Sequence, residues 1–314
     1  MDHFLLAVYS IIGCSGLLLL RFVLERFLFA PVGLWFGLRN LTTKKPPDNP
    51  ILEKEFSRSK KWDRRQISGL SKQLDISEER IKNWLRLKLA QTKPSVLGQC
   101  CNSSWEFFYN TFKMVCGFVV LWDKPWLWDM DECWRDLANQ TVTNDVLFYF
   151  IVCASCAGSQ LIGLTLDEKR KDFYVTLSHH LALILLLALS GYSNFFRCVT
   201  VAIFMSDSSD VIIEASRVAK YLGYEKTSMY LFLIFTVWWI VVRLALHPFR
   251  VMKSFIVDAP RMIPGFSTHF AYYAISCLIV VFFTVNLLWT YFVLKAARLL
   301  FVSGKIKDSR SNSD

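Results

Sequence analysis

Two adjacent histidines, His179 and His180, stand inside an otherwise apolar stretch of the chain. Only five histidines occur among the 314 residues. An ionisable group at membrane depth costs free energy and usually marks a functional site. The structural alternative is a histidine at a helix contact, hydrogen-bonded to a backbone carbonyl. Because neighbouring residues of a helix point about 100° apart, we expect one imidazole to react and the other to pack or to orient it.

Acidic residues follow the histidines at helical spacing. Asp207, Asp210 and Glu214 stand at positions i, i+3 and i+7, which a helix places along one face. A solvated start of a cytosolic helix would give the same pattern. In the functional interpretation, one carboxylate accepts the N–H of a histidine, fixes its tautomer and raises its basicity. These residue types also bind metals, but adjacent histidines on one helix converge poorly on one ion. We therefore predict no metal site.

Two further groups of polar residues flank the histidine pair. Lys169, Arg170 and Lys171 precede it at the expected cytosolic mouth of the same helix, where they could anchor the helix or bind the phosphates of an anionic substrate. Asn194 and Arg197 follow it at the other end, and we expect them to pair with polar groups in the bundle. All five are candidate substrate-binding residues.

The composition indicates that the chain is a membrane protein, so these polar residues would lie within or beside membrane helices. Hydrophobic residues make up 54% of the chain and aromatic residues 15%, which excludes a disordered protein, a small disulfide scaffold and most soluble enzymes. Crossing the hydrocarbon core takes about 20 helical residues. Seven apolar runs approach or reach that length, of which the fifth is short: Phe4–Leu20, Trp105–Leu121, Val146–Leu166, Tyr174–Leu189, Phe195–Met205, Met229–Leu246 and Phe270–Leu294. Each must be a helix, because lipid offers backbone groups no hydrogen bonds. The predicted fold class is therefore an all-α polytopic membrane protein.

Basic residues predict the orientation. Residues 39–95 hold 15 Lys and Arg against 7 Asp and Glu, and the C-terminal tail is also basic. Seven spans would place both in the cytosol. Asn139 then begins a glycosylation sequon on the far side of the membrane. Two further sequons, at Asn40 and Asn102, would lie in the cytosol and stay unmodified.

The basic segment has a helical pattern of its own. Its apolar residues form two helical faces separated by a short turn, with Ser77 placed to cap the second helix. These residues are Ile67, Leu70 and Leu74, then Ile81, Trp84 and Leu85. The pattern resembles the last two helices of a homeodomain, although a first helix has little room between Pro50 and Lys61. The asparagine that contacts adenine falls at Leu87, which cannot make that bidentate hydrogen bond. We therefore do not expect DNA binding, and a module that contacts phosphates, anionic lipid or a protein partner fits the segment better.

The run from Lys169 to Tyr221 resembles the signature of the ceramide synthase, or longevity-assurance, family. It reads KRKDFYVTLSHH, then SGYSNFFR, then SDSSDVIIEASRVAKY. The upstream LWDKPWLWD and the homeodomain-like stretch ending in IKNW are similar to that family too. Animal members often have histidine before the first aspartate of the third motif, where this chain has Ser206.

The resemblance implies a domain organisation. Residues 1–38 would hold an N-terminal transmembrane helix and residues 39–97 the cytosolic homeodomain-like segment. Residues 98–303 would form a TLC membrane domain, a six-helix bundle with its catalytic signature at 169–221. Residues 304–314 would be a cytosolic polar tail.

The resemblance also implies an activity: transfer of a fatty acyl group from acyl-CoA to the amine of a sphingoid base, giving ceramide or dihydroceramide in the endoplasmic reticulum membrane. His179, His180, Asp207 and Asp210 would be catalytic, with no cofactor beyond acyl-CoA as co-substrate. A histidine would act either as general base or as a nucleophile that forms an acyl-imidazole, and family knowledge favours the second. The resemblance is compatible with a homodimer or heterodimer. The alternative is a non-catalytic lipid-sensing or chaperone protein of the same membrane fold.

Acyl-chain choice would depend on the depth of the tunnel and on the segment before the last span. In relatives this segment, here about residues 247–267, affects chain length. It contains Pro248, Pro260, Pro264 and Gly265, which favour turns over helix.

Overall fold

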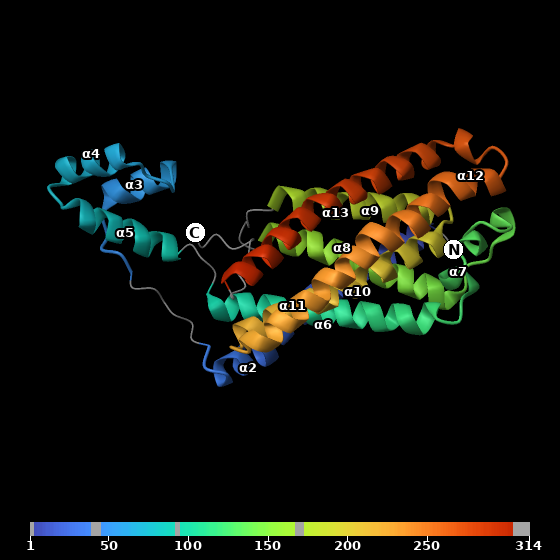
Figure 1. Cartoon of the computed structure of the whole chain (residues 1–314), viewed down its shortest axis with the longest axis horizontal. Helices are drawn as coiled ribbons and strands as arrows, with labels where there is room; N and C mark the ends of the chain where they lie inside the picture. The colour runs from blue at the N-terminus through green and yellow to red at the C-terminus, as the bar shows by residue number, and fades with distance from the viewer. Residues whose placement is uncertain (1–2, 39–44, 92–94, 167–172, 304–314) are drawn as a thin grey trace.

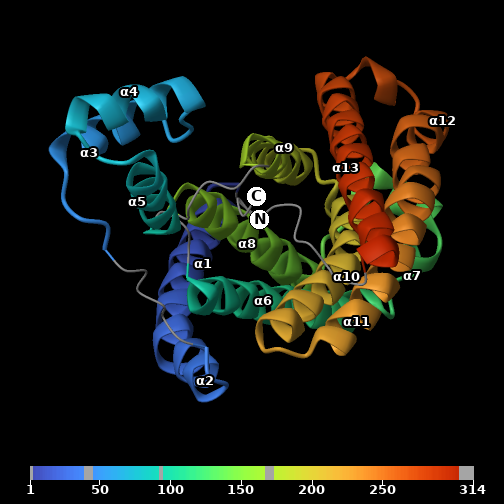
Figure 2. The ribbon, with the colours of Figure 1, turned by 60° about the vertical axis from the view of Figure 1, so that its left-hand side comes forward.

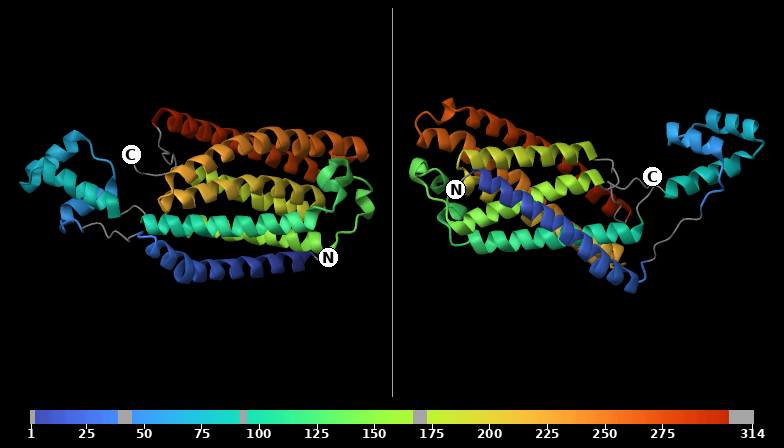
Figure 3. Two further views of the ribbon diagram at one scale, coloured as in Figure 1. Left: turned by 60° about the horizontal axis from the view of Figure 1, so that its bottom comes forward. Right: turned by 180° about the vertical axis from the view of Figure 1, so that it is seen from behind.

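The computed structural model describes residues 3–38, 45–91, 95–166 and 173–303, and every regular element in these ranges is helical. The long helices lie side by side in one bundle, and a group of three short helices stands at one end of it (Figure 1). The amino end of the chain lies at the opposite end of the bundle (Figure 3). The all-α prediction is confirmed for the described residues.

Among the residues that the structure describes, five helical segments are long and apolar enough to cross a membrane. They are His3–Trp35 (α1, His3–Leu24; η1, Glu25–Phe29; α2, Ala30–Trp35), α8 (Asn144–Leu166), α9 (Phe173–Tyr192), Glu225–Met262 (from α11 to α12) and α13 (Phe270–Ser303). Their outer faces carry large apolar side chains such as Phe22, Leu185 and Tyr291. An apolar surface of this extent marks a membrane-embedded protein. The prediction of a multi-pass membrane protein is therefore confirmed, without the exact number of spans.

Two further helices of 26 residues each are more polar than these five. They are α6 (Val96–Leu121) and α10 (Phe196–Tyr221). α10 packs against α6 on one side and against α11 (Glu225–Trp239) on the other (Figure 2). The predicted fifth run and the acidic residues after it form this one continuous helix, so Asp207 and Glu214 are buried rather than solvated.

The segment expected to turn is mostly helical, which corrects the prediction for residues 247–267. The helix of α11 continues through η4 (Ile240–Met252), η5 (Ser254–Asp258) and α12 (Ala259–Met262). Pro248 lies inside η4, a π-helical stretch; membrane helices tolerate proline where local changes of this kind satisfy the freed backbone groups. The chain turns only after Met262, around Gly265, whose φ of 76° suits a residue without a side chain.

The three short helices have a core of their own. They are α3 (Pro50–Arg58), α4 (Arg64–Leu74) and α5 (Glu78–Gln91), and the first has nine residues. Trp84 is 3% exposed, stacks on Trp62 at 6.0 Å between ring centroids and donates to the Pro47 carbonyl. Asp63 and Gln66 form a capping box that starts α4. The predicted helix pair exists, with the short first helix packed against it.

The opposite end of the bundle is closed by the segment between α6 and α8. It contains α7 (Pro125–Trp128), η2 (Met130–Cys133) and η3 (Leu137–Asn139). Trp134, among the most buried side chains, packs edge-on against Phe195, Phe255 and Phe266 and donates to Ser254 Oγ at 2.7 Å. We call this part of the molecule the capped end.

Candidate active site

A cavity of about 260 Å³ lies inside the bundle, bordered by residues of α1, α6, α8, α9, α10, α11, η4, η5 and α13. The polarity of the cavity wall changes along α10. From its C-terminal end toward its N-terminal end the lining residues are Arg217 and Glu214, then Asp210 and Asp207, then Ala202. The wall nearest the three short helices is therefore polar, and Arg21, Asn102, Glu106 and Gln160 add to it. Toward the capped end the lining is apolar, with Leu183, Leu186, Val199, Phe255 and Ile279. Such a cavity can hold a molecule with a polar head and an apolar tail.

Both predicted histidines line this cavity, between its polar and apolar parts. Their ring centroids lie 5.5 Å apart at an interplanar angle of 78°. The ring of His179 also contacts two aromatic rings of α13, Phe282 at 5.0 Å and Trp289 at 4.9 Å. Among the described residues, neither Nδ1 atom has a hydrogen-bond partner. No hydrogen bond joins either imidazole to a carboxylate in the described part of the chain, and ring packing holds His179.

Asp207 pairs with a lysine and not with a histidine. Its Oδ1 lies 2.8 Å from Nζ of Lys113 on α6, and both side chains are buried. The ammonium also lies 5.7 Å from the centre of the Tyr109 ring. Oδ2 of Asp207 is buried without a partner in the described part of the chain. Asp207 is therefore not the carboxylate that accepts a histidine N–H in the expected pairing.

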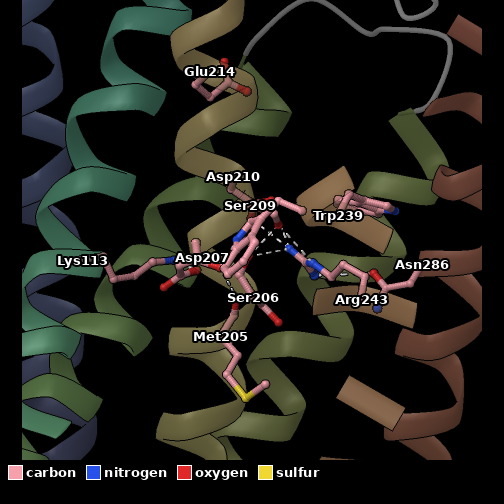
Figure 4. A network of polar contacts seen from close by, with 12 residues as sticks. Lys113, Met205, Ser206, Asp207, Ser209, Asp210, Glu214, Trp239, Arg243 and Asn286 are labelled. Carbon is pink, nitrogen blue, oxygen red and sulfur yellow. Dashed lines mark hydrogen bonds and ion pairs between the residues drawn. The ribbon is translucent and has the colours of Figure 1, made fainter. Parts of the chain in front are cut away.

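Asp210 pairs with Arg243 of η4 (Figure 4). Nη2 of the arginine donates to both carboxylate oxygens at 3.0 and 3.1 Å and to the Ser206 carbonyl at 3.1 Å. Its Nε donates to Ser209 Oγ at 3.4 Å, Nη1 reaches Asn286 Oδ1 at 3.5 Å, and the guanidinium lies 4.9 Å from the Trp239 ring centroid. Arg243 therefore ties α10 and η4 to α13. The recorded contacts of Asp210 likewise include no histidine, so this carboxylate also has a cationic partner that the sequence interpretation did not name.

Sequence reasoning missed Lys113 and Arg243, although a signal was present. Each is an ionisable residue inside a run that was itself assigned as a span, and such residues are functional candidates by default. Trp289 and Asn286 gave no such signal, because an indole or an amide is ordinary in a membrane helix. The two ion pairs give the cavity wall balanced charge.

The remaining predicted site residues lie elsewhere. Lys169, Arg170 and Lys171 fall outside the described residues. Asn194 (φ 60°) and Arg197 lie at the capped end and do not line the cavity. Arg197 instead donates to the Glu132 carbonyl at 3.0 Å and stacks over Trp126 at 4.4 Å.

Two further expectations concern metals and the turn segment. Within the described ranges, no three His, Cys, Asp or Glu side chains are grouped so that they could hold a metal ion. Of the segment expected to affect chain length, His247, Val251 and Phe255 line the cavity from η4 and η5. That segment therefore reaches the cavity through a helix rather than a loop.

Comparisons with known proteins agree with this architecture. Residues 99–295 match the TLC domain family, and residues 39–91 match the homeodomain family. The chain is 30% identical to ceramide synthase 5 of Homo sapiens, over 95% of this chain and 76% of that protein. It is 30% identical to ceramide synthase 3 of Mus musculus, over 95% and 77%, and 29% identical to ceramide synthase 4 of Bos taurus, over 95% and 75%.

Proposed function

The chain belongs to the ceramide synthase family of TLC-domain proteins, and from this membership we propose that it transfers a fatty acyl group from acyl-CoA to the amine of a sphingoid base. The product is ceramide or dihydroceramide. The observation that carries the proposal is the cavity, which has a histidine pair and two ion pairs between a polar and an apolar part. Both substrates have a polar head and a long apolar tail, so both match its walls.

The apolar part of the cavity favours the acyl tail. Burial of each methylene is worth about 0.8 kcal/mol, and the lining toward the capped end offers apolar side chains from α9, α10, η5 and α13. The polar part lies where a charged CoA head group would enter. The thioester of a bound acyl-CoA would then lie near the histidine pair.

Two routes are open for the transfer. In the first, an imidazole accepts a proton from the sphingoid ammonium, and the amine attacks the thioester directly. In the second, an imidazole attacks first, and the amine resolves the acyl-imidazole. Both routes break the C–S bond, form the amide C–N bond and release CoA as the thiol with one net proton. Acyl-CoA is the co-substrate and no cofactor is required.

The proposal includes a membrane arrangement. α6 and α10 complete a seven-span protein of the endoplasmic reticulum, in which their polar residues face the cavity. Residues 1–38 form the first span, 39–97 the cytosolic segment and 98–303 the TLC domain. The tail, 304–314, lies outside the described residues. Association into homodimers or heterodimers is a separate prediction that crosslinking in membranes would test.

The decisive assay uses the purified full-length protein in detergent with labelled acyl-CoA and sphinganine. We expect labelled dihydroceramide from the wild type and none from the His179→Ala/His180→Ala variant, with both proteins equally folded and membrane-inserted. A folded wild type that binds labelled sphingoid base and releases no CoA would contradict the proposal and indicate a non-catalytic lipid-sensing protein. Equal product from both proteins would remove the histidines from the mechanism.

A further inference from the structure

In the described part of the chain, the cavity wall contains two buried cations, Lys113 and Arg243, whose hydrogen-bonding capacity is used to different extents. Arg243 directs Nε, Nη1 and Nη2 at four partners, so its guanidinium is occupied in holding helices together. Lys113 is 6% exposed and has one recorded ion pair, to Asp207, and the ring face of Tyr109 beside it. An ammonium has three N–H donors. Lys113 therefore retains donors that its recorded contacts in the described chain do not use.

The same pair has unused capacity on its acidic side. Asp207 accepts Lys113 through Oδ1, whereas Oδ2 is buried and has no partner among the described residues. A buried polar atom without a partner costs free energy, and a bound ligand is one way to satisfy it. The ion pair thus has a spare donor and a spare acceptor, and both of its residues line the cavity that holds the imidazoles.

The spare donor of Lys113 and the spare acceptor of Asp207 match the charges that develop on the two substrates. Attack on a thioester moves negative charge onto the carbonyl oxygen, and a preorganised donor in a water-poor site stabilises that charge. The other substrate arrives as an ammonium, which needs an acceptor. We propose that Lys113 is a catalytic residue that donates a hydrogen bond to this oxyanion, while Asp207 Oδ2 accepts a hydrogen bond from the incoming ammonium.

The proposal rests on the acyl transfer described above and adds no reactant to it. As the carbonyl carbon is attacked, its oxygen becomes an oxyanion bound by a Lys113 N–H, and Lys113 stays protonated throughout. The oxyanion collapses, the C–S bond breaks and CoA leaves as the thiolate. A histidine takes one proton from the ammonium, and the thiolate takes the second as the amide forms. The assignment holds for the direct and for the acyl-imidazole route, since both pass through a tetrahedral oxyanion.

The test compares Lys113→Met with Lys113→Arg in the purified full-length protein. Removal of one oxyanion donor costs about 10²-fold or more in kcat, so we expect that loss in Lys113→Met. Lys113→Arg keeps a cationic donor and should stay within about tenfold of the wild type. Lys253→Met is the matched control, because it removes a lysine from an exposed ion pair with Asp258 at the capped end. Its kcat should be unchanged.

A binding measurement separates catalysis from structure. An S-alkyl-CoA thioether has no carbonyl oxygen, so its Kd should be the same for wild type and Lys113→Met. If the methionine variant does not fold, Lys113→Gln replaces it, because its neutral amide can still donate to Asp207 but brings no positive charge to the oxyanion. A kcat of the folded variant within about twofold of wild type, or a parallel loss of thioether binding and thermal stability, would overturn the proposal. An inactive wild type would overturn the proposed function itself.

Discussion

Arg243 on η4 donates through one nitrogen to both carboxylate oxygens of Asp210 on α10, at 3.0 and 3.1 Å. The arginine is 5% exposed and the carboxylate faces the cavity, so the pair joins a membrane helix to the wall of the site. It lies on the opposite side of α10 from the Lys113–Asp207 pair (Figure 4). The helix that carries the aspartates is therefore held by a cation from each side.

This relationship predicts a cost for Asp210→Asn. The substitution leaves a buried guanidinium without its counter-charge. Because the Asp210 side chain is 37% exposed, we expect the free energy of unfolding to fall by about 2 kcal/mol, less than for a fully buried pair. The matched control is Asp258→Asn, which breaks an exposed pair with Lys253 and should cost less than about 1 kcal/mol. Denaturant unfolding in detergent micelles measures both. Equal costs for the two variants would mean that Arg243 does not depend on Asp210 for its charge balance.

The contacts of His179 predict which imidazole reacts. Its ring lies between Phe282 and Trp289, whereas the only ring contact recorded for His180 in the described chain is with His179. A reacting group must be held in its productive orientation, and small misplacements cost large factors in rate. If His179 is the reacting group, Trp289→Ala should lower kcat at least about tenfold and leave the KM for acyl-CoA nearly unchanged.

Tyr291→Ala is the control for this experiment. Tyr291 lies on the same helix, is 61% exposed on the outside of the bundle and does not line the cavity. Its kcat should match the wild type. A Trp289→Ala enzyme of normal kcat would assign the chemistry to His180 instead.

The sequence predicts which residues of two helices line this site, but not the contacts that those residues make. The histidine pair and the i, i+3, i+7 acidic face follow from helical periodicity within one stretch, and the structure places His179, His180, Asp207 and Asp210 in one cavity. Which cation meets which carboxylate depends on how distant helices pack. Sequence spacing says nothing of that, so a His–Asp contact was expected where Lys113–Asp207 is found.

The errors about helix ends have a similar physical origin. The apolar run ends at Met205, and prolines favour turns over helix in water. In the bundle, α10 continues past Met205 because its polar side chains face a cavity, and η4 continues through Pro248 as π-helix. The number of spans remains a prediction for the same reason: α6 and α10 are long but polar, and only packing shows that their polar faces turn inward.

The apolar part of the cavity predicts an effect on chain-length preference. Ala202 is 9% exposed and lines the cavity on the capped-end side of the histidine region. Ala202→Phe should fill that space and shift the products toward shorter acyl chains, because a longer tail would have to leave part of its methylenes unburied. An equimolar mixture of palmitoyl-, stearoyl- and lignoceroyl-CoA, with products resolved by mass spectrometry, measures the shift. Ala7→Phe on the exposed face of α1 is the control, and a product profile identical in both variants would place the acyl tail elsewhere.

The capped end predicts a single glycosylation site. Asn139 is exposed on η3, and its amide donates to Asp136 at 2.9 Å. Asn102 instead lines the cavity on α6 and accepts a hydrogen bond from Arg21, which leaves a glycosyltransferase no access to it.

If the capped end faces the lumen, the protein made with microsomes should show one endoglycosidase-sensitive shift in mobility. Asn139→Gln should abolish that shift and Asn102→Gln should not. If the mobility shift persists in Asn139→Gln, or if the wild type shows no shift, Asn139 is not a glycosylated lumenal residue. Either result would remove this support for the orientation that the basic residues predict.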